Sequence, residues 1–217
     1  MTKRPIVILG GGGHAKVIID MLVDHQTLMP IGCVVDDRSV HPPQVLNLPV
    51  LGDESYLEEL MRQGVTTAIV AVGENRIRAL ITSKLKSMGM ELVSIISEFA
   101  KVSSFARIGE GVVVMPMAVV GPDTTVEEGA IINTSASVDH DCFIGAFCHV
   151  APGCSLAGNV RIGSKSFLGV GTVVLPDRTI GCDVMVGAGA VVIKDVPDGV
   201  TVMGVPARLR QSQVLSN

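Results

Sequence analysis

The sequence predicts two domains of different fold class, an α/β domain over residues 1–97 and a parallel β-helix over residues 98–217. Three observations lead to this prediction. Apolar strand-like runs alternate with helical patterns over residues 4–96, as in a small parallel α/β sheet. A run of four glycines follows the first of these strands. From residue 98 to about residue 196, helical periodicity disappears and a six-residue period replaces it.

The elements of the first domain follow one another in a regular order. An apolar, β-branched run at 5–9 predicts a buried strand, and the glycine run then opens into a helical pattern within 10–25. Residues 31–37 predict a second strand that ends in two carboxylates. A third strand is expected at 66–73, an amphipathic helix with a terminal glycine at 74–89, and a fourth strand at 91–96.

The glycine run carries a nucleotide-binding signal. Gly10, Gly12 and Ala15 satisfy the G-x-G-x-x-A pattern after a strand, and Asp36 and Asp37 end the next strand. Backbone N–H groups at a helix N-terminus suit a pyrophosphate, and the carboxylates suit a ribose hydroxyl or a base N–H. The pattern does not select NAD. About four strands make only half of a dinucleotide fold, so this Rossmann-like half-domain fits a mononucleotide carrier such as UDP better.

The second domain repeats every six residues. Counted in sixes from Val102 to Val192, all sixteen first positions are Val, Ile or Leu, without an insertion. Four places later in each hexad the residue is mostly small. One large and one small side chain per hexad would point inward, so that successive coils of a parallel β-helix stack into one continuous core.

The cysteines fit this repeat as core residues. Cys142, Cys148 and Cys154 occupy the small inward position. The total of five cysteines is odd and no CxxC motif occurs, which argues against a disulfide framework or a zinc site. We therefore expect no metal.

The hexapeptide repeat resembles that of the left-handed β-helix acyltransferases, and it covers close to half of the chain. In that family three hexads make one coil, three chains form a trimer, and CoA-dependent acyl transfer takes place at clefts between subunits. The resemblance implies about five coils, a homotrimer, and acetyl-CoA as co-substrate. It also implies that the α/β domain covers the first coil.

Polar residues in one stretch of the repeat suggest catalysis. His140 and Asp141 lie outside the inward positions, and so does His149, so we expect all three on the outer surface or at a corner of the coil. A carboxylate beside an imidazole suits a general base. The plainer interpretation is a polar surface turn.

A closer resemblance gives these residues roles. The segment IINTSASVDHDCFIGAFCHVAPGCSLAGNVRIG (131–163) resembles the acetyltransferases that modify the amino group of UDP-4-amino sugars in bacterial glycan biosynthesis, the bacillosamine type. This implies that His140 is the base and that Asp141 raises its basicity. It places His149 near the acetyl-CoA thioester and Asn133 in the same cleft. The Gly158 N–H is the expected oxyanion donor.

Both ends of the chain resemble the same family. Towards the C-terminus the segments GVGTVV and VGAGAVV imply that Val170 and Ala188 line the pantetheine arm of CoA. Towards the N-terminus the family has strand-GxxGH, a DD pair and AxGxNxxR, and it binds the UDP-sugar there. The residues that match, and that we expect to bind substrate, are Gly12, Gly13, His14, Asp36, Asp37 and Gly73.

These observations predict an acetyl-CoA-dependent N-acetyltransferase. The expected acceptor is the 4-amino group of a UDP-2-acetamido-4-amino-2,4,6-trideoxyhexose, and the expected transfer is direct. A covalent acyl-enzyme on Cys142 is disfavoured because the repeat points this thiol inward, where we expect a buried thiol of unshifted pKa. Three alternatives stay open: a sialic-acid-type sugar O-acetyltransferase, a β-helix metal protein of the carbonic anhydrase kind, and a non-catalytic NAD-sensing or scaffold protein.

Composition excludes other classes of function. The formal net charge is −4 and aromatic residues make up 3% of the chain, so nothing predicts a nucleic-acid binder. No uncharged apolar run reaches the ~18 residues that a membrane span requires. We therefore expect a cytoplasmic protein.

Overall fold

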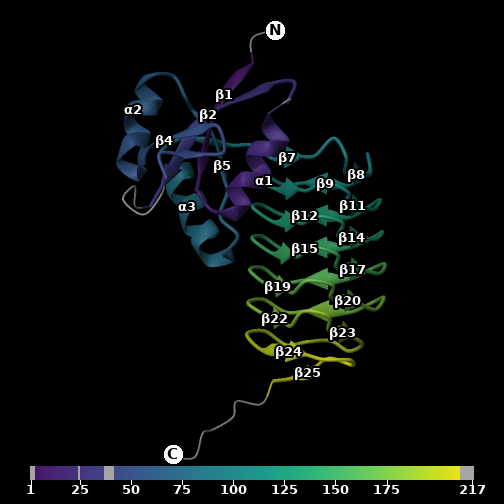
Figure 1. The fold of residues 1–217 in the computed structure, drawn as a ribbon. Coiled ribbons are helices and arrows are strands. Elements are labelled where there is room, and N and C mark those ends of the chain that lie inside the picture. The colour runs from purple at the N-terminus through teal and green to yellow at the C-terminus, as the bar shows by residue number, and fades with distance from the viewer. Residues whose placement is uncertain (1–2, 24, 37–41, 211–217) are drawn as a thin grey trace, which may run out of the picture. The chain divides into compact units, whose positions relative to one another are not determined.

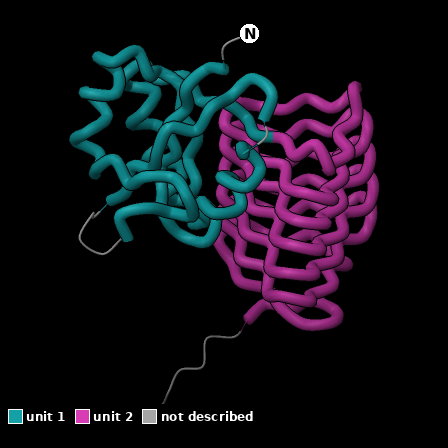
Figure 2. Tube along the Cα trace, turned by 45° about the horizontal axis from the view of Figure 1, so that its top comes forward, with its two compact units in different colours: residues 1–95 teal, residues 96–217 magenta. Residues whose placement is uncertain are grey.

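A computed structural model describes residues 3–23, 25–36 and 42–210. The chain forms two compact units, residues 1–95 and residues 96–217 (Figure 2). Within the described residues, no helix combines the length and the apolar character needed to cross a membrane.

The first unit is a twisted, mostly parallel sheet with helices (Figure 1). The strand order is β3-β4-β2-β1-β5-β6, and only the β3–β4 pair is antiparallel. The elements are β1 (Arg4–Leu9), α1 (Gly13–Leu22), β2 (Leu28–Val35), β3 (Gln44–Val45), β4 (Leu48–Asp53), the 3-10 turn η2 (Glu54–Tyr56), α2 (Leu57–Arg62), β5 (Thr67–Val70), α3 (Asn75–Ser87) and β6 (Glu91–Leu92).

This unit has more strands than the sequence predicted. Six strands form the sheet where about four were expected, because the β3–β4 hairpin extends it beyond β2. The strand expected at 91–96 is also two strands. Residues 91–92 pair with β5, whereas β7 (Ile95–Ile96) joins a sheet of the β-helix. The chain passes from one sheet to another inside this apolar segment, and hydrophobicity alone does not reveal such a change.

The second unit is a β-helix with three parallel sheets, and its left-handed class is as predicted. We call them the first, second and third sheets. The first holds β7, β10 (Val113–Val114), β13 (Ile131–Ile132), β16 (His149–Val150), β19 (Phe167–Leu168), β22 (Met185–Val186), β24 (Thr201–Met203) and the antiparallel β25 (Arg208–Leu209). The second holds β8 (Lys101–Val102), β11 (Val119–Val120), β14 (Ser137–Val138), β17 (Ser155–Leu156), β20 (Val173–Val174) and β23 (Val191–Val192). The third holds β9 (Arg107–Ile108), β12 (Thr125–Val126), β15 (Phe143–Ile144), β18 (Arg161–Ile162) and β21 (Thr179–Ile180).

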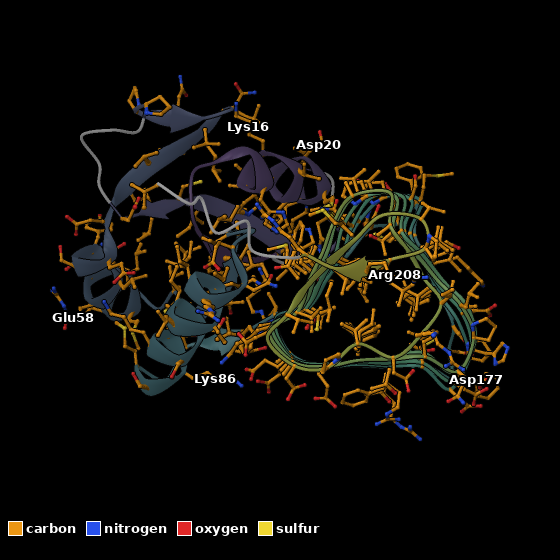
Figure 3. All side chains as sticks on the ribbon, turned by 90° about the horizontal axis from the view of Figure 1, so that it is seen from below. Lys16, Asp20, Glu58, Lys86, Asp177 and Arg208 are labelled. Atoms are coloured by element: carbon orange, nitrogen blue, oxygen red, sulfur yellow. The ribbon has the colours of Figure 1, made fainter. Side chains whose placement is uncertain are left out.

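Register shows that three hexads make one coil. Ile131 pairs with His149, and His149 pairs with Phe167, so each step along a sheet is eighteen residues. The second residue of each short strand points inward, and the small residue of each hexad fills the space beside it. Seen along the axis, the coils superimpose as a three-sided ring with side chains inside and outside (Figure 3).

The corners between the sheets need a left-handed backbone conformation at every sixth residue. From residue 111 to residue 189, each of these positions has a positive φ. Glycine occupies five of them, and the others are Met117, Asp123, Ser135, Asp141, Phe147, Asn159, Lys165, Asp177 and Asp183. Asp and Asn tolerate this conformation better than most residues with a side chain. Asp141 of the predicted catalytic pair therefore lies at a corner.

Candidate active site

A pocket of about 490 Å³ opens in the first unit, at the carboxyl ends of its parallel strands. Ligands of open α/β sheets bind at this edge. The loops after β1, β2 and β5 contribute to the pocket, together with η2. Its lining residues are Leu9, Gly10, Gly11, Gly12, Gly13, His14, Val34, Val35, Asp36, Glu54, Ala71, Val72, Gly73, Ile77 and Ile81.

The glycine loop leaves room at the start of α1. Gly12 is the N-cap, and no side chain caps the helix there. A Cβ added at Gly12 or Gly13 would meet no atom within 4 Å. Gly10 differs, because its φ is +122° and a Cβ would lie 2.8 Å from the carbonyl oxygen of Ala71. The chain thus needs Gly10 for packing, whereas Gly12 and Gly13 border open space beside backbone N–H groups that suit an anion.

The loop after β5 rests on a buried guanidinium. Arg78 is 1% exposed, and its Nη1 donates to the carbonyl oxygens of Val72 and Gly73, at 3.0 Å each. Its Nη2 donates to Asn75 Oδ1 at 2.9 Å. These contacts explain the AxGxNxxR pattern: Asn75 and Arg78 hold the loop so that Gly73 lines the pocket. As at Gly12, a Cβ at Gly73 would meet no atom within 4 Å.

Five of the residues expected to bind substrate line this pocket: Gly12, Gly13, His14, Asp36 and Gly73. Asp37 lies outside the described residues. Sequence reasoning missed Glu54, which also lines the pocket and pairs with Lys84 of α3. The available signal was Asp53, whose carboxylate accepts from the backbone N–H of Ser55 and so caps η2.

His140 and Asp141 form a hydrogen-bonded pair in the second unit. Their Nδ1 and Oδ2 atoms are 2.7 Å apart, so the carboxylate of Asp141 reaches the ring. Both side chains are more than half exposed, in agreement with the expected corner position. The hydrogen bond to Asp141, followed by the charge of Asp139, raises the pKa of His140 above its ordinary value. With Nδ1–H donating to the carboxylate, Nε2 carries the lone pair of the neutral ring.

The imidazole of His140 lies against the next coil at Gly158. A Cβ added at Gly158 would be 2.5 Å from Cε1 and 2.6 Å from Nε2 of His140. The backbone N–H of Gly158 has no hydrogen-bond acceptor in the described part of the chain. It therefore provides a donor next to the candidate base, as an oxyanion site requires.

His149 occupies an outward-facing strand position, one of the two placements expected, but its side chain is largely covered. It lies on β16 rather than at a corner, and it is only 9% exposed. Asn133, on the preceding coil, has Nδ2 at 2.9 Å from His149 Nε2. Phe167, on the following coil, packs edge to face against the ring with a centroid separation of 5.1 Å. The position points away from the β-helix core as predicted, but these neighbours help to cover it.

The two groups of candidate residues lie on different parts of the β-helix. His140 follows β14, at the corner between the second and third sheets, and Gly158 is one coil further along that corner. Asp177 marks the same corner in Figure 3, two coils beyond Asp141. Asn133 and His149 belong to the first sheet and its edge. The exposed residues Val170 and Ala188 follow β19 and β22 of that sheet, so they share its corner with the second.

The Cys142 thiol is poorly suited to act as a nucleophile. The side chain points inward, is 2% exposed, and donates its S–H to the carbonyl oxygen of Ala157 at 3.2 Å. Burial raises the pKa of the thiol. The expected unshifted pKa was therefore wrong, and the shift lowers the thiolate fraction further.

Metal-ligand geometry is also lacking near these residues. Over residues 3–23, 25–36 and 42–210, no three His, Cys, Asp or Glu side chains are grouped so that they could hold a metal ion.

Comparisons with known proteins identify the family. The sequence model of the PglD N-terminal domain matches residues 5–85. The structure of PerB from Caulobacter crescentus, in complex with CoA and GDP-perosamine, is 45% identical with a TM-score of 0.91, and the match covers 95% of this chain and 97% of that one. The chain belongs to the hexapeptide-repeat sugar N-acetyltransferases. Like its relatives, this hexapeptide-repeat N-acetyltransferase uses acetyl-CoA as co-substrate.

Two further relatives of this N-acetyltransferase match over nearly the whole chain. The acetyltransferase domain of PglB from Neisseria gonorrhoeae is 41% identical with a TM-score of 0.89, covering 96% of this chain and 100% of that one, and it is also known in complex with acetyl coenzyme A. WeeI from Acinetobacter baumannii is 26% identical with a TM-score of 0.81, again with 96% and 100% coverage. Because the chain belongs to an enzyme family, the alternative of a non-catalytic NAD-sensing or scaffold protein is excluded.

Proposed function

We propose that this enzyme transfers the acetyl group of acetyl-CoA to the 4-amino group of a nucleotide-linked 4-amino-4,6-dideoxy sugar. The observation that carries the proposal is the His140–Asp141 pair, whose 2.7 Å hydrogen bond leaves Nε2 as the basic nitrogen. A carboxylate that holds the ring in this tautomer and stabilises the imidazolium suits a general base.

The chemistry is one direct transfer. The 4-amine attacks the thioester carbonyl carbon, a C–N bond forms, and Nε2 of His140 accepts the proton that the amine loses. The tetrahedral oxyanion receives a hydrogen bond from the Gly158 N–H, which lies beside the same ring. The C–S bond then breaks, and the thiolate of CoA leaves and takes up a proton to give CoASH.

The pocket of the first unit would hold the nucleotide part of the acceptor. Its volume of about 490 Å³ falls within the usual range of ligand sites. The open space at Gly12 and Gly13, beside the N-terminus of α1, suits a diphosphate. Asp36 and Glu54 supply carboxylates that can accept from a ribose hydroxyl or a base N–H.

The identity of the nucleotide is part of the proposal. We infer a UDP carrier from the half-size α/β unit and from the resemblance to the bacillosamine type. A GDP carrier is the second candidate, because the PerB enzyme, 45% identical to this chain, was crystallised with GDP-perosamine. The cytoplasm, where both acetyl-CoA and nucleotide sugars are found, stays the predicted location.

We further propose that the working enzyme is a homotrimer. His140 with Gly158, and Asn133 with His149, Val170 and Ala188, lie on different edges of one β-helix. Packing the corner of one copy against the first sheet of another would join the base of one chain to the CoA-binding residues of its neighbour. Co-expression of His140→Ala with His149→Ala tests this. Activity should reappear in the mixed assembly, and its absence from a mixed trimer would contradict a shared site.

The central test is a steady-state assay that follows CoASH release. UDP-2-acetamido-4-amino-2,4,6-trideoxyglucose and GDP-perosamine are compared as acceptors, with wild type and His140→Ala. Replacing the base should lower kcat by about 10²-fold or more. Support comes also from the GDP-perosamine enzyme, which was studied with one histidine replaced by asparagine and by alanine. Turnover with a hydroxyl acceptor alone would move the function to O-acetylation. Unchanged turnover in His140→Ala would refute the assignment of the base.

A further inference from the structure

Asn133 was expected to line the cleft, yet its amide is engaged on both sides by this chain. Its Oδ1 accepts from the backbone N–H of Thr134 at 2.7 Å and from the Thr134 hydroxyl at 3.3 Å. Its Nδ2 lies 2.9 Å from His149 Nε2. All three residues belong to the β-helix, on two neighbouring coils.

The backbone N–H of Thr134 determines how the amide is oriented. A peptide N–H can only donate, so the atom that faces it must be the amide oxygen and not the NH₂ group. The NH₂ group consequently faces His149 and donates to it. An imidazole nitrogen that accepts a hydrogen bond carries a lone pair, and so Nε2 of His149 is not protonated.

We propose that Asn133 is a positioning residue that holds His149 as the neutral Nδ1–H tautomer. This ring then carries its proton at Nδ1, and its lone pair at Nε2 is engaged by Asn133. Phe167, packed edge to face on the ring, limits its rotation and keeps Nε2 towards Asn133.

Both histidines are then Nδ1–H tautomers, but their ring nitrogens have different hydrogen-bond partners. In His140 the carboxylate of Asp141 accepts from Nδ1–H, which leaves the lone pair of Nε2 available. In His149 the amide of Asn133 donates to Nε2, which places the ring proton on Nδ1. Nε2 of His140 is left to accept a proton, whereas Nε2 of His149 is engaged by Asn133, and this difference supports His140 as the general base. This last step rests on the proposed acetyl transfer, whereas the tautomer itself does not.

Nitrogen-15 NMR of the full-length enzyme tests the tautomer. Long-range ¹H–¹⁵N correlation of histidine-labelled protein near pH 8 separates protonated from unprotonated ring nitrogens, and His149→Gln assigns the signal. We expect wild-type His149 to show a protonated Nδ1 and an unprotonated Nε2. A protonated Nε2 in the wild-type spectrum would overturn the proposal, and this measurement needs no acceptor and no turnover.

Asn133→Asp tests the role of the amide. The carboxylate can only accept, so it should draw the proton of His149 onto Nε2. Asn47→Asp, in the exposed turn between β3 and β4, makes the same charge change elsewhere and should leave the His149 signals and kcat as in wild type. We expect kcat of Asn133→Asp to fall about tenfold or more, as for other residues that orient a reacting group. Unmoved His149 signals, or unchanged kcat with a moved proton, would show that Asn133 does not position this ring for catalysis.

Discussion

The ring of His140 lies so close to Gly158 that a Cβ on Gly158 would overlap the ring in its present position. The two residues are on adjacent coils at one corner of the β-helix, and a Cβ at Gly158 would come within 2.6 Å of Nε2, the proposed basic nitrogen. The missing side chain at Gly158 thus leaves room for the imidazole. The same residue offers its N–H to the oxyanion, so two functions meet at one backbone position.

Gly158→Ala should therefore inactivate the enzyme without unfolding it. The exposed ring of His140 can swing away from the new methyl group, so the fold survives while the base is displaced. We expect kcat to fall about 10²-fold, as a misplacement of about 1 Å can do. Steady-state kinetics and thermal unfolding measure the two effects. Gly199→Ala, at a corner with φ +69° and open space, is the control and should cost about 1 kcal/mol of stability with kcat retained.

Asp141→Asn should move the pH dependence of kcat/KM to lower pH. Asp141 and then Asp139 raise the pKa of His140, and the base works only when deprotonated, so wild-type activity falls as the pH drops through this raised value. Without the Asp141 charge the pKa of His140 decreases, and the acidic limb shifts downwards. The plateau should also be lower, because the ring loses the carboxylate that orients it. Asp139→Asn should give a smaller shift in the same direction. If the acidic limb of the kcat/KM profile does not move in Asp141→Asn, the titration of His140 is not the origin of that limb.

Gly12→Val should weaken binding of the nucleotide-sugar acceptor and leave binding of acetyl-CoA unchanged. A side chain at Gly12 meets no protein atom within 4 Å, so it enters the space proposed for the diphosphate. We expect KM for the nucleotide sugar to rise about tenfold or more, which corresponds to a loss of about 1.4 kcal/mol of binding. KM for acetyl-CoA and the melting temperature should remain near wild type. Gly10→Ala is the contrasting variant and should lose stability, because its Cβ would be 2.8 Å from the Ala71 carbonyl oxygen. Equal changes in both KM values for Gly12→Val would argue against a nucleotide site there.

Cys142→Ala should keep most of the activity. The thiol is buried, its S–H donates to Ala157, and its pKa is raised, so direct transfer to the sugar amine needs nothing from it. We expect kcat within about twofold of wild type and a stability loss of about 1 kcal/mol, the usual size of one buried hydrogen bond. Mass spectrometry after incubation with acetyl-CoA should find no acetylated Cys142. A loss of activity comparable to that of His140→Ala, together with an acetylated thiol in wild type, would favour a covalent route.

Much of the fold could be predicted from the sequence because its signals are local and periodic. An aliphatic residue at every sixth position has one physical solution, a coil that points these side chains inward, and the eighteen-residue register of Ile131, His149 and Phe167 follows from it. The glycine run after β1 likewise indicated the pocket that Gly12 and Gly13 border. The β3–β4 hairpin and Glu54 carried weaker signals, because short strands and a single 3-10 turn have no repeating pattern.

The sequence by itself determined the residue types of the site, namely an imidazole next to a carboxylate, a second histidine and a helix-opening glycine loop. Only the tertiary structure decided which atoms face one another. Residues 16 or 18 positions apart, such as Asn133 with His149 and Gly158 with His140, come into contact because each coil lies directly on the previous one. A hydrogen bond or a close contact depends on that stacking, and no local pattern of residues contains it.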